Sequence, residues 1–492
     1  MRFVQRRSRA VVFADATAIA VAIAVAVAGL VPGPAGARAQ APAPPPHARS
    51  PYVSIDTAVV ALQHVTVIDG TGAAARHDET IVIEHGQIQA VGPSATVSIP
   101  AGARVLDLPG HTVIPGIVGL HDHMYYGSSV AGTRSMLTSY PRLFLASGVT
   151  TIRTTGSLDP YQEMNVRAAI ERGAVVGPDI IVSGPYVQGR NSSVSWMHEL
   201  STPDDARRLV RYWSEEGVPW FKAYTQITRD ELRAAIEEAH HHGMKVTAHL
   251  CSVGFREAVG MGIDNLEHGL LTDTEFWPGK QPDVCPVASD SAQYDNLDIN
   301  GADVRRTIDD MVSHHVAMTS TLAVFELSSP SRIPLDPRVY DALAPGAATT
   351  VRAWYDTAQH RNDAAERVAF GKAMAFERAF VKAGGLLGAG SDPCCLTEIA
   401  GYGDQRNFEL LNEAGFTPEQ AVQIMTSNGA KVLGISDRVG TIAPGKQADL
   451  VVVDGDVVSH PSIRNVTTVF RRGVGYDVAA LTASVRGMVG LK

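Results

Sequence analysis

Short apolar runs alternate with amphipathic, helix-type patterns through the middle of the chain. Strands that alternate with helices form βαβ units with parallel strands. Eight such units predict an α/β fold, a (β/α)8 TIM-like barrel. The eight candidate strands are Val113–Leu120, Thr150–Thr154, Ile180–Ser183, Trp220–Tyr224, Lys245–Leu250, Ile263–His268, Ala317–Leu322 and Gly385–Gly390.

Short β-type runs separated by turn signals lie on both sides of this region. Two of them, Ala448–Asp454 and Thr467–Arg471, are near the C-terminus. Two small β segments therefore bracket the middle of the chain. The runs on the N-terminal side are Val59–Leu62, His64–Ile68, Thr80–Glu84, Gln87–Val91 and Ala103–Leu108.

Helix-start signals support the alternation. Thr228 and Glu231 have the spacing of a capping box, and Gly243 follows at the place of a left-handed helix end. Thr-Pro pairs at Thr202 and Thr417 predict two more helix starts, with proline in the first turn. Two long stretches without a clear pattern, Leu271–Gly301 and Phe325–Thr350, are expected to be functional loops.

The first 39 residues have the order of a secretory signal peptide. Four arginines precede the apolar run Ala16–Val31, and Ala37-Arg38-Ala39 offers a cleavage site. The alternative is an uncleaved membrane anchor, but the run is shorter than the roughly 20 residues that span a bilayer. We expect a periplasmic or secreted protein, exported by the Sec or the twin-arginine route. Residues 40–56 are Pro/Ala-rich and are expected to form a linker.

Composition narrows the function classes. The chain has 492 residues, 45% hydrophobic and 19% charged, with a net charge of −9, which is ordinary for a globular protein and excludes a disordered chain. The acidic balance argues against nucleic acid as a partner. Four cysteines are too few for a disulfide scaffold.

Ionisable residues stand at the ends of five predicted strands. His121 and His123 follow the first, and because side chains alternate along a strand, both imidazoles project from one face. In a barrel the carboxyl ends of the strands form the catalytic face. A lone His or Lys would be an ordinary surface or core residue, but five strands with such ends favour a metal site. The others are Lys222, His249, His268 and Asp392.

In this order, these residues resemble the amidohydrolase superfamily. The flanking phrases Val-Ile-Pro-Gly at 113–116 and Gly-Thr-Ile-Ala-Pro-Gly-Lys-Gln-Ala-Asp-Leu at 440–450 fit the same family. The resemblance covers about Thr57–Arg472 and is greatest to the imidazolonepropionase-like branch, which includes Xaa-Pro dipeptidases (prolidases). It implies a barrel over residues 111–439 and a small β-sandwich formed by both chain ends, residues 57–110 and 440–480.

The resemblance implies a binuclear centre with two divalent ions, expected to be Zn. His121, His123 and Asp392 would hold one metal, and His249 and His268 the other. Lys222 would be carboxylated and bridge them, which suits a lysine that burial makes easier to neutralise. The alternative is an unmodified Lys222 beside a single metal.

The implied mechanism is hydrolysis of an amide bond. Two metals lower the pKa of a bridging water, and the resulting hydroxide attacks the substrate carbonyl. Asp392 would accept the water proton and pass it to the leaving nitrogen. Tyr224 could donate to the developing oxyanion, or could simply pack at the barrel mouth. Relatives often have Asp directly after the residue corresponding to Arg153, whereas this chain has Thr154.

Candidate substrate contacts follow from position. Tyr125 and Tyr126 come directly after the two histidines. Arg190 follows the third predicted strand and could bind a substrate carboxylate, although a surface arginine is the simpler interpretation. Cys285 could form a disulfide with Cys394 or Cys395 at the barrel mouth, while Cys251 is expected to be free and buried.

We therefore expect an exported metal-dependent amidohydrolase. The expected substrate is a dipeptide of the Xaa-Pro type or an N-acyl amino acid. The enzyme alternative is an imidazolonepropionase-like hydrolase of a cyclic amide, lactone or carbamate. The alternative outside the enzyme class is a metal-binding protein without turnover. Such a protein would have lost the general base or a metal ligand, whereas this chain keeps Asp392 and all the presumed ligands. We expect a homo-oligomer that contacts a membrane only through its export signal.

Overall fold

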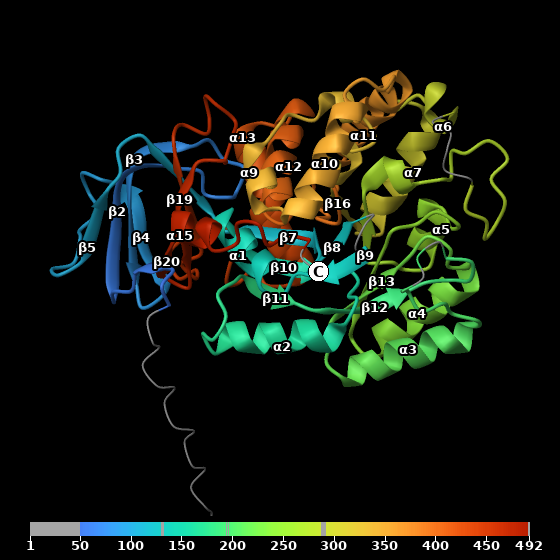
Figure 1. The fold of residues 1–492 in the computed structure, drawn as a ribbon, viewed down its shortest axis with the longest axis horizontal. Coiled ribbons are helices and arrows are strands. Elements are labelled where there is room, and N and C mark those ends of the chain that lie inside the picture. Colours follow the sequence, from blue (N-terminus) through green and yellow to red (C-terminus); the bar gives the residue numbers. More distant parts are fainter. Residues whose placement is uncertain (1–49, 129–131, 193, 195, 287–291, 491–492) are drawn as a thin grey trace, which may run out of the picture. The chain divides into compact units, whose positions relative to one another are not determined.

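The computed structural model describes residues 50–128, 132–192, 194, 196–286 and 292–490 (Figure 1). The predicted signal peptide, residues 1–39, lies outside the described residues, as does most of the predicted linker. Among the described residues, none of the helices combines the length and the apolar character needed to cross a membrane.

Strands from both ends of the chain form one nine-stranded sheet. Its N-terminal strands pair mainly as antiparallel neighbours, and β18 pairs antiparallel with β6 to join the C-terminal strands to them. The order is β1 (Val53–Ile55), β20 (Val474–Asp477), β19 (Val466–Arg471), β18 (Leu450–Asp454), β6 (His111–Pro115), β2 (Val59–Val67), β3 (Arg76–Glu84) and β4 (Gln87–Pro93), with β5 (Arg104–Asp107) on β2.

The middle of the chain forms two parallel sheets. One has the order β11 (Asp179–Ile181), β10 (Val149–Thr154) and β7 (Ile117–Asp122). The other runs in chain order through β12 (Ser183–Val187), β13 (Trp220–Ala223), β14 (Lys245–Ala248), β15 (Asn265–Glu267), β16 (Ala317–Ser320) and β17 (Leu387–Ala389). Contacts at both sides link the sheets. Ser157 forms a parallel bridge with Pro185, and the Asp392 N–H donates to the His121 carbonyl at 2.8 Å.

Helices follow these strands along the chain, and α3 and α4 lie against each other (Figure 1). The sequence between the strands contains α1 (Ser139–Ala146), α2 (Pro160–Glu171), α3 (Pro203–Glu215), α4 (Arg229–His241), α5 (Phe255–Gly260), α6 (Ala292–Asp295), α7 (Ala302–Ser313), α8 (Leu322–Glu326), α9 (Pro337–Ala342), α10 (Pro345–Ala358) and α11 (Ala364–Lys382). After β17 come α12 (Tyr402–Glu413), α13 (Pro418–Gln423), α14 (Gly429–Leu433) and α15 (Val478–Ala483). A further antiparallel pair joins β8 (Tyr125–Ser128) to β9 (Gly132–Ser135).

The predicted helix starts are confirmed. Thr228 accepts from the Glu231 N–H, and the Thr228 N–H donates to the Glu231 carboxylate, which is the complete capping box. Thr202 and Thr417 cap α3 and α13 with proline in the first turn. The stretch Phe325–Thr350, expected to be a loop, contains α9 and the start of α10. Its overlooked signal is Asp336 before a proline, because Asp336 accepts from the Arg338 N–H and caps α9.

The first predicted barrel strand, Val113–Leu120, is two strands in the structure. Its first half, β6, belongs to the nine-stranded sheet, and its second half, β7, belongs to a parallel sheet. Gly116 separates them, and a Cβ at this position would lie 2.1 Å from the Thr150 hydroxyl oxygen. A residue without a side chain therefore lets the chain pass from one sheet to the other in close contact with β10.

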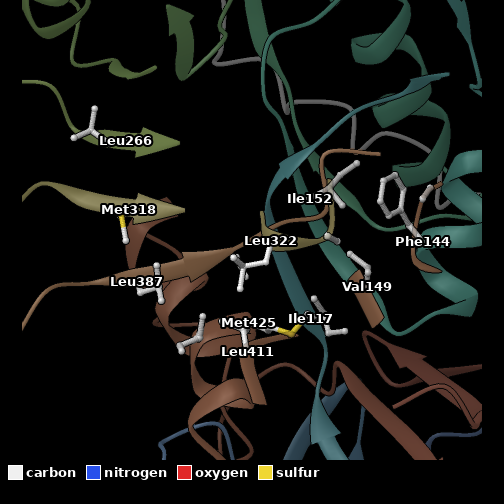
Figure 2. Packing of buried hydrophobic residues seen from close by; sticks show 14 of the residues in the cluster. Ile117, Phe144, Val149, Ile152, Leu266, Met318, Leu322, Leu387, Leu411 and Met425 are labelled. Carbon is white, nitrogen blue, oxygen red and sulfur yellow. The ribbon is translucent and has the colours of Figure 1, made fainter. Parts of the chain in front are cut away.

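The buried core joins the parallel strands to the helices around them. Figure 2 shows Ile117, Val149 and Ile152 from neighbouring strands near Phe144 of α1, and all four are at most 1% exposed. Parallel strands covered on both faces have continuous apolar runs, which is why the sequence pattern located them. The rigid strands place their carboxyl ends, and the residues that follow, at one edge.

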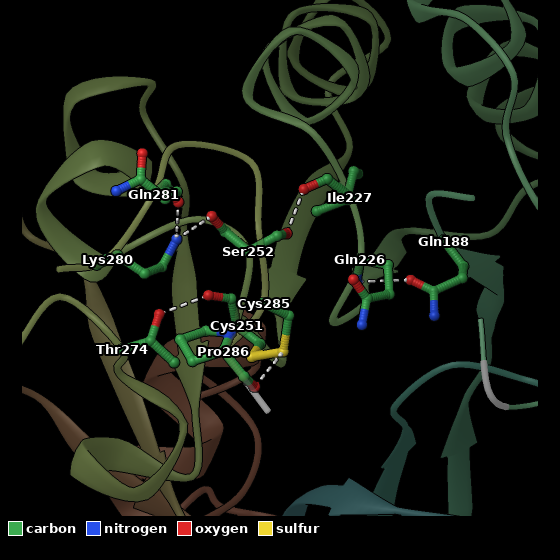
Figure 3. The surroundings of a disulfide bond; sticks show 10 residues. All are labelled: Gln188, Gln226, Ile227, Cys251, Ser252, Thr274, Lys280, Gln281, Cys285 and Pro286. Atoms are coloured by element: carbon green, nitrogen blue, oxygen red, sulfur yellow. Dashed lines mark hydrogen bonds between the residues drawn. A yellow bond between two sulfur atoms is a disulfide. The ribbon is translucent and has the colours of Figure 1, made fainter. Parts of the chain in front are cut away.

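A disulfide joins Cys251 to Cys285, with their Cα atoms 4.9 Å apart (Figure 3). The prediction that Cys285 pairs with Cys394 or Cys395 is therefore wrong, as is that of a free Cys251; Cys394 and Cys395 are free thiols. The physical reason is local. Lys280 donates to the Ser252 carbonyl at 2.6 Å and holds the long loop against the end of β14.

Replacing Cys285 with Ser should lower the free energy of unfolding by ~3–4 kcal/mol, because the bond closes a loop of 34 residues in the unfolded chain. Urea denaturation without reductant measures this. Cys395→Ser is the matched control, and it should leave the unfolding midpoint nearly unchanged. Equal midpoints for Cys285→Ser and the wild type would contradict the pairing.

Candidate metal centre

Three of the predicted ligands come together at the carboxyl ends of β7 and β17. The ligand atoms of His121, His123 and Asp392 all lie within 4.8 Å of one another. The Asp392 carboxylate is 3.0 Å from His123 Nε2 and 3.7 Å from His121 Nε2. Residues on different strands reach one point because parallel strands end at the same edge.

The remaining predicted ligands surround this group. Lys222 Nζ is 3.5 Å from His121 Nε2, and the ring of His268 has its centroid 4.5 Å from that of His121. The ring of His249 lies 4.4 Å from that of His268. The structure therefore brings all six predicted ligands into one cluster, although only His121, His123 and Asp392 are spaced as a compact ligand set.

The donor atoms of this cluster suit divalent metal ions. His268 Nδ1 forms a hydrogen bond with the Thr321 hydroxyl at 2.7 Å. The other ring nitrogen, Nε2, is buried and has no hydrogen-bond partner among the described residues. An imidazole held through one nitrogen with the other nitrogen left free is the arrangement of a metal ligand. Neutral imidazoles and a carboxylate together match the preferences of zinc and related ions.

Protonation states also fit a metal. Burial lowers the pKa of His121 and His268 well below the usual value, and it lowers that of His249 to about 3, so the imidazoles are neutral. Burial opposes ionisation of Asp392, but His121 and His123 outweigh it and hold its pKa below the usual range. Burial lowers the pKa of Lys222 to about 8 despite the opposing effect of Glu267, so this amine loses its proton more easily than a surface lysine.

Two of these residues have an uncommon backbone conformation. His268 has φ = 70° and Asp392 has φ = 53°, in the left-handed region that non-glycine residues rarely adopt. Such conformations cost roughly 1 kcal/mol or more each and persist where the surrounding structure requires them, often at functional sites. Here the turn after each strand directs the side chain into the cluster.

Sequence reasoning missed Glu267, the carboxylate at the centre of a buried network. Glu267 accepts from Arg153 at 2.6 Å and lies 2.8 Å from His121 Nδ1. Thr247 and Asn265 also donate to it. Glu267 therefore orients His121, whose Nε2 faces the cluster. The available signal was the pair of opposite charges, Arg153 and Glu267, inside two apolar strands.

Replacing Glu267 with Gln should lower the free energy of unfolding by roughly 3 kcal/mol, because it leaves the fully buried Arg153 without its anionic partner. Urea denaturation of the variant measures this loss. The matched control is Glu237→Gln, which removes an exposed pair with Arg207 and should cost less than about 1 kcal/mol. Equal costs for the two variants would contradict the role of Glu267.

Aromatic rings lie along one side of the cluster. The predicted pocket residue Tyr125 stacks on His123 with ring centroids 4.6 Å apart, and its hydroxyl is 2.8 Å from that of Tyr186. The ring centroid of Tyr224 lies 4.9 Å from that of His249. Trp196, which is 40% exposed, contacts Tyr125 and Tyr186 at the solvent side. Tyr186, in β12, and Trp196, in the loop that follows, were not predicted, because no pattern in the sequence distinguishes them from ordinary aromatic residues.

The other two predicted substrate contacts lie elsewhere. The Tyr126 hydroxyl donates to the Leu396 carbonyl at 2.9 Å, and its ring is buried in the core rather than beside the histidines. Arg190 is exposed and donates to the Ser201 carbonyl at 3.2 Å. The structure does not bring either side chain to the cluster, so the sequence order alone was misleading for these two.

Comparisons with known proteins agree with this arrangement. A model described as the amidohydrolase family matches residues 112–475. An enamidase from Eubacterium barkeri is 24% identical over 392 residues, covering 76% of this chain and 81% of the relative, and an imidazolonepropionase from Hahella chejuensis is 20% identical over 416 residues, covering 77% and 87%. The crystal structure of a prolidase candidate from Bifidobacterium longum superposes with a TM-score of 0.63 at 25% identity, covering 88% of this chain and all of the other.

Proposed function

Because this chain belongs to the amidohydrolase family and is a hydrolase that acts on C–N bonds, we propose that it cleaves the amide bond of a dipeptide of the Xaa-Pro type or of an N-acyl amino acid. The observation that carries this proposal is the convergence of His121, His123 and Asp392 within 4.8 Å beside the buried Lys222. The similarity to the prolidase candidate from Bifidobacterium longum supports a dipeptide as the substrate.

The residues of the cluster would hold two divalent ions, expected to be Zn. His121, His123 and Asp392 would bind one ion, His249 and His268 the other, and carboxylated Lys222 would bridge them. When bound, such ions lower the pKa of water and polarise a substrate carbonyl. The free Nε2 of His268 and the easily deprotonated amine of Lys222 support these assignments.

Two side chains would carry protons in the reaction. Asp392 is ionised and faces His123, so it would accept the proton of the attacking water and deliver it to the leaving nitrogen. Burial raises the pKa of Tyr224, which keeps its phenol protonated and able to donate to the oxygen of the substrate carbonyl. Tyr125, Tyr186 and Trp196 would cover one side of the substrate and exclude water.

The proposed framework is a closed (β/α)8 barrel over residues 111–439 with a β-sandwich built from residues 57–110 and 440–480. The links between the two parallel sheets and the shared nine-stranded sheet support it.

We also propose export to the periplasm or the medium. The signal-like N-terminus and the disulfide, which persists in oxidising compartments, support export. A homo-oligomer is the proposed assembly.

Hydrolysis of a cyclic amide is the second candidate. The sequence relatives named enamidase and imidazolonepropionase favour it. Lys222 favours the first candidate, because a carboxylated lysine could bridge the two ions of a binuclear centre. Imidazolonepropionase resembles enzymes whose centre holds a single ion, and such a centre needs no bridge. The two candidates therefore differ in the number of ions that the protein should hold.

Metal content and turnover, measured on the same purified sample, test the proposal. The substrates are Xaa-Pro dipeptides, N-acyl amino acids and cyclic amides. About two metals per chain, with chelator-sensitive hydrolysis of a linear amide, is the expected result. One metal with turnover of only the cyclic amides would favour the second candidate. Absence of metal after reconstitution would overturn both.

A further inference from the structure

Four aromatic side chains form a continuous wall beside the metal centre, which we call the aromatic wall. Tyr125 begins β8, Tyr186 lies in β12, Trp196 lies in the loop after β12, and Tyr224 directly follows β13. The Trp196 ring centroid lies 5.7 Å from that of Tyr125 and 5.5 Å from that of Tyr186. The ring of Tyr186 in turn lies 5.2 Å from that of Tyr224. These are contact distances for aromatic rings, so the wall has no gap between its members.

The centre of the aromatic wall is held in place by close packing. Tyr186 is 3% exposed, and its hydroxyl shares a hydrogen bond of 2.8 Å with that of Tyr125. Gly156 lies against the Tyr186 ring with φ = 84°, and a Cβ at this position would lie 2.5 Å from the ring. Only a glycine allows the backbone to approach so closely in this conformation. A wall that is already ordered loses little conformational freedom when it binds a ligand.

The partly exposed residues around the metal centre are mainly aromatic. Asp392 and Tyr224 are half-buried, and Trp196 is 40% exposed. Half-buried Phe325 of α8 adds a ring 5.2 Å from that of His268. Phenol, indole and benzyl groups carry no charge at neutral pH. The side of the centre that solvent reaches therefore presents uncharged ring surface next to the proposed general base.

The proposed proton path gives the substrate a direction along the aromatic wall. Tyr224 would donate to the oxygen of the scissile amide, whereas Asp392 would deliver a proton to its nitrogen. Asp392 lies 3.0 Å from His123 Nε2, and the ring of Tyr125 stacks on His123 at 4.6 Å. The bond from the carbonyl carbon to the nitrogen thus runs towards Tyr125. The group attached to the nitrogen would lie against Tyr125 and Trp196.

We propose that the aromatic wall binds the side chain of the released amino acid, and that this side chain is aromatic. The inference rests on the proposed function and narrows its substrate class to N-acyl derivatives of aromatic amino acids. A substrate ring gains edge-to-face contacts with the wall in addition to its burial, and an aliphatic side chain lacks them. Trp196 determines the specificity, because it is the ring of the wall that has the most free surface.

Steady-state kinetics of the metal-loaded enzyme with three substrates tests the proposal. They are N-acetyl-L-phenylalanine, N-acetylglycine and N-phenylacetylglycine, in which the ring is on the acyl side. We expect kcat/KM for N-acetyl-L-phenylalanine to exceed that for N-acetylglycine by roughly 10- to 100-fold, the range for burial of one large apolar side chain. N-phenylacetylglycine should resemble N-acetylglycine, because its ring points away from Tyr125 and Trp196.

Trp196→Ala should lower kcat/KM for N-acetyl-L-phenylalanine roughly tenfold, mainly through KM, and the loss for N-acetylglycine should be much smaller. Trp196→Phe keeps a ring at this position and should restore most of the preference. The matched control is Tyr212→Ala on α3, which removes an aromatic side chain that is 49% exposed. This variant should keep the wild-type preference.

Calorimetric titration with L-phenylalanine and with glycine gives a second measurement, which does not require turnover. Phenylalanine should bind the wild type more tightly than glycine, and Trp196→Ala should remove this difference. Equal kcat/KM for N-acetyl-L-phenylalanine and N-acetylglycine would overturn the inference and leave the proposed function intact. A preference for N-phenylacetylglycine would also overturn it, since the ring would then lie on the acyl side. Binding of phenylalanine that depends on Trp196, without hydrolysis of any amide, would support the aromatic site and overturn the proposed function alone.

Discussion

Replacing Asp392 with Asn should lower kcat for amide hydrolysis by roughly 10²–10⁴-fold, the range associated with loss of a general base. The carboxylate lies 3.0 Å from His123 Nε2, and its pKa is held below the usual range, so it is an ionised acceptor among the proposed ligands. Steady-state kinetics together with metal analysis measure the effect. An amide at this position can still contact an ion but accepts no proton.

The matched control for this variant is Asp309→Asn, an exposed aspartate on α7. It should have wild-type kcat and metal content. If Asp392→Asn kept full turnover, the proposed proton path would be wrong. If the wild type bound metal but hydrolysed none of the substrates, the protein would be a metal binder, the alternative outside the enzyme class.

Replacing Lys222 with Ala should reduce the metal content from about two ions per chain to one or fewer, with a parallel loss of turnover. Lys222 is 1% exposed and its Nζ lies 3.5 Å from His121 Nε2, so its side chain is buried directly beside a proposed ligand and would be placed to bridge the two ions. Added propionate should restore part of the metal content, because a short carboxylate can enter the space that the truncated side chain leaves.

Lys382→Ala, at the exposed end of α11, is the control and should keep both ions. Carbon-13 NMR of the wild type grown with labelled bicarbonate gives an independent measurement, since a carbamate on Lys222 should produce a carbonyl resonance that the variant lacks. A Lys222→Ala variant with a full metal complement would contradict the bridging role and leave a one-metal centre as the better description.

The strand ends were the most predictable part of the site. His121, His249, His268 and Asp392 each follow an apolar run, and parallel strands bring such ends together whatever the loops do. Burial of both sheet faces made these runs visible in the sequence. The left-handed conformation at His268 could not be foreseen, because the pattern contains no signal for it in a residue other than glycine, Asn or Asp.

Contacts between distant segments were much less predictable. The partner of Cys285 depends on how a long loop folds back to β14, which no local pattern records. The contact of Glu267 with Arg153 and His121 likewise depends on how β15 of one parallel sheet meets β10 and β7 of the other. Two boundaries inside predicted barrel strands were missed. The one at Gly116 was visible only as a glycine, and its meaning required the position of Thr150. The other divides the predicted strand Ile180–Ser183 between β11 and β12, which belong to different sheets.

The pairing of β18 with β6 sets an order of events during synthesis. Ile114 of β6 is registered with Val451 of β18, so one edge of β6 has no partner until almost the whole chain has emerged. Contacts between residues so far apart in sequence slow folding and leave strand edges exposed meanwhile. A chain truncated before residue 450 should therefore aggregate through this edge, even though it retains every residue of the proposed metal centre.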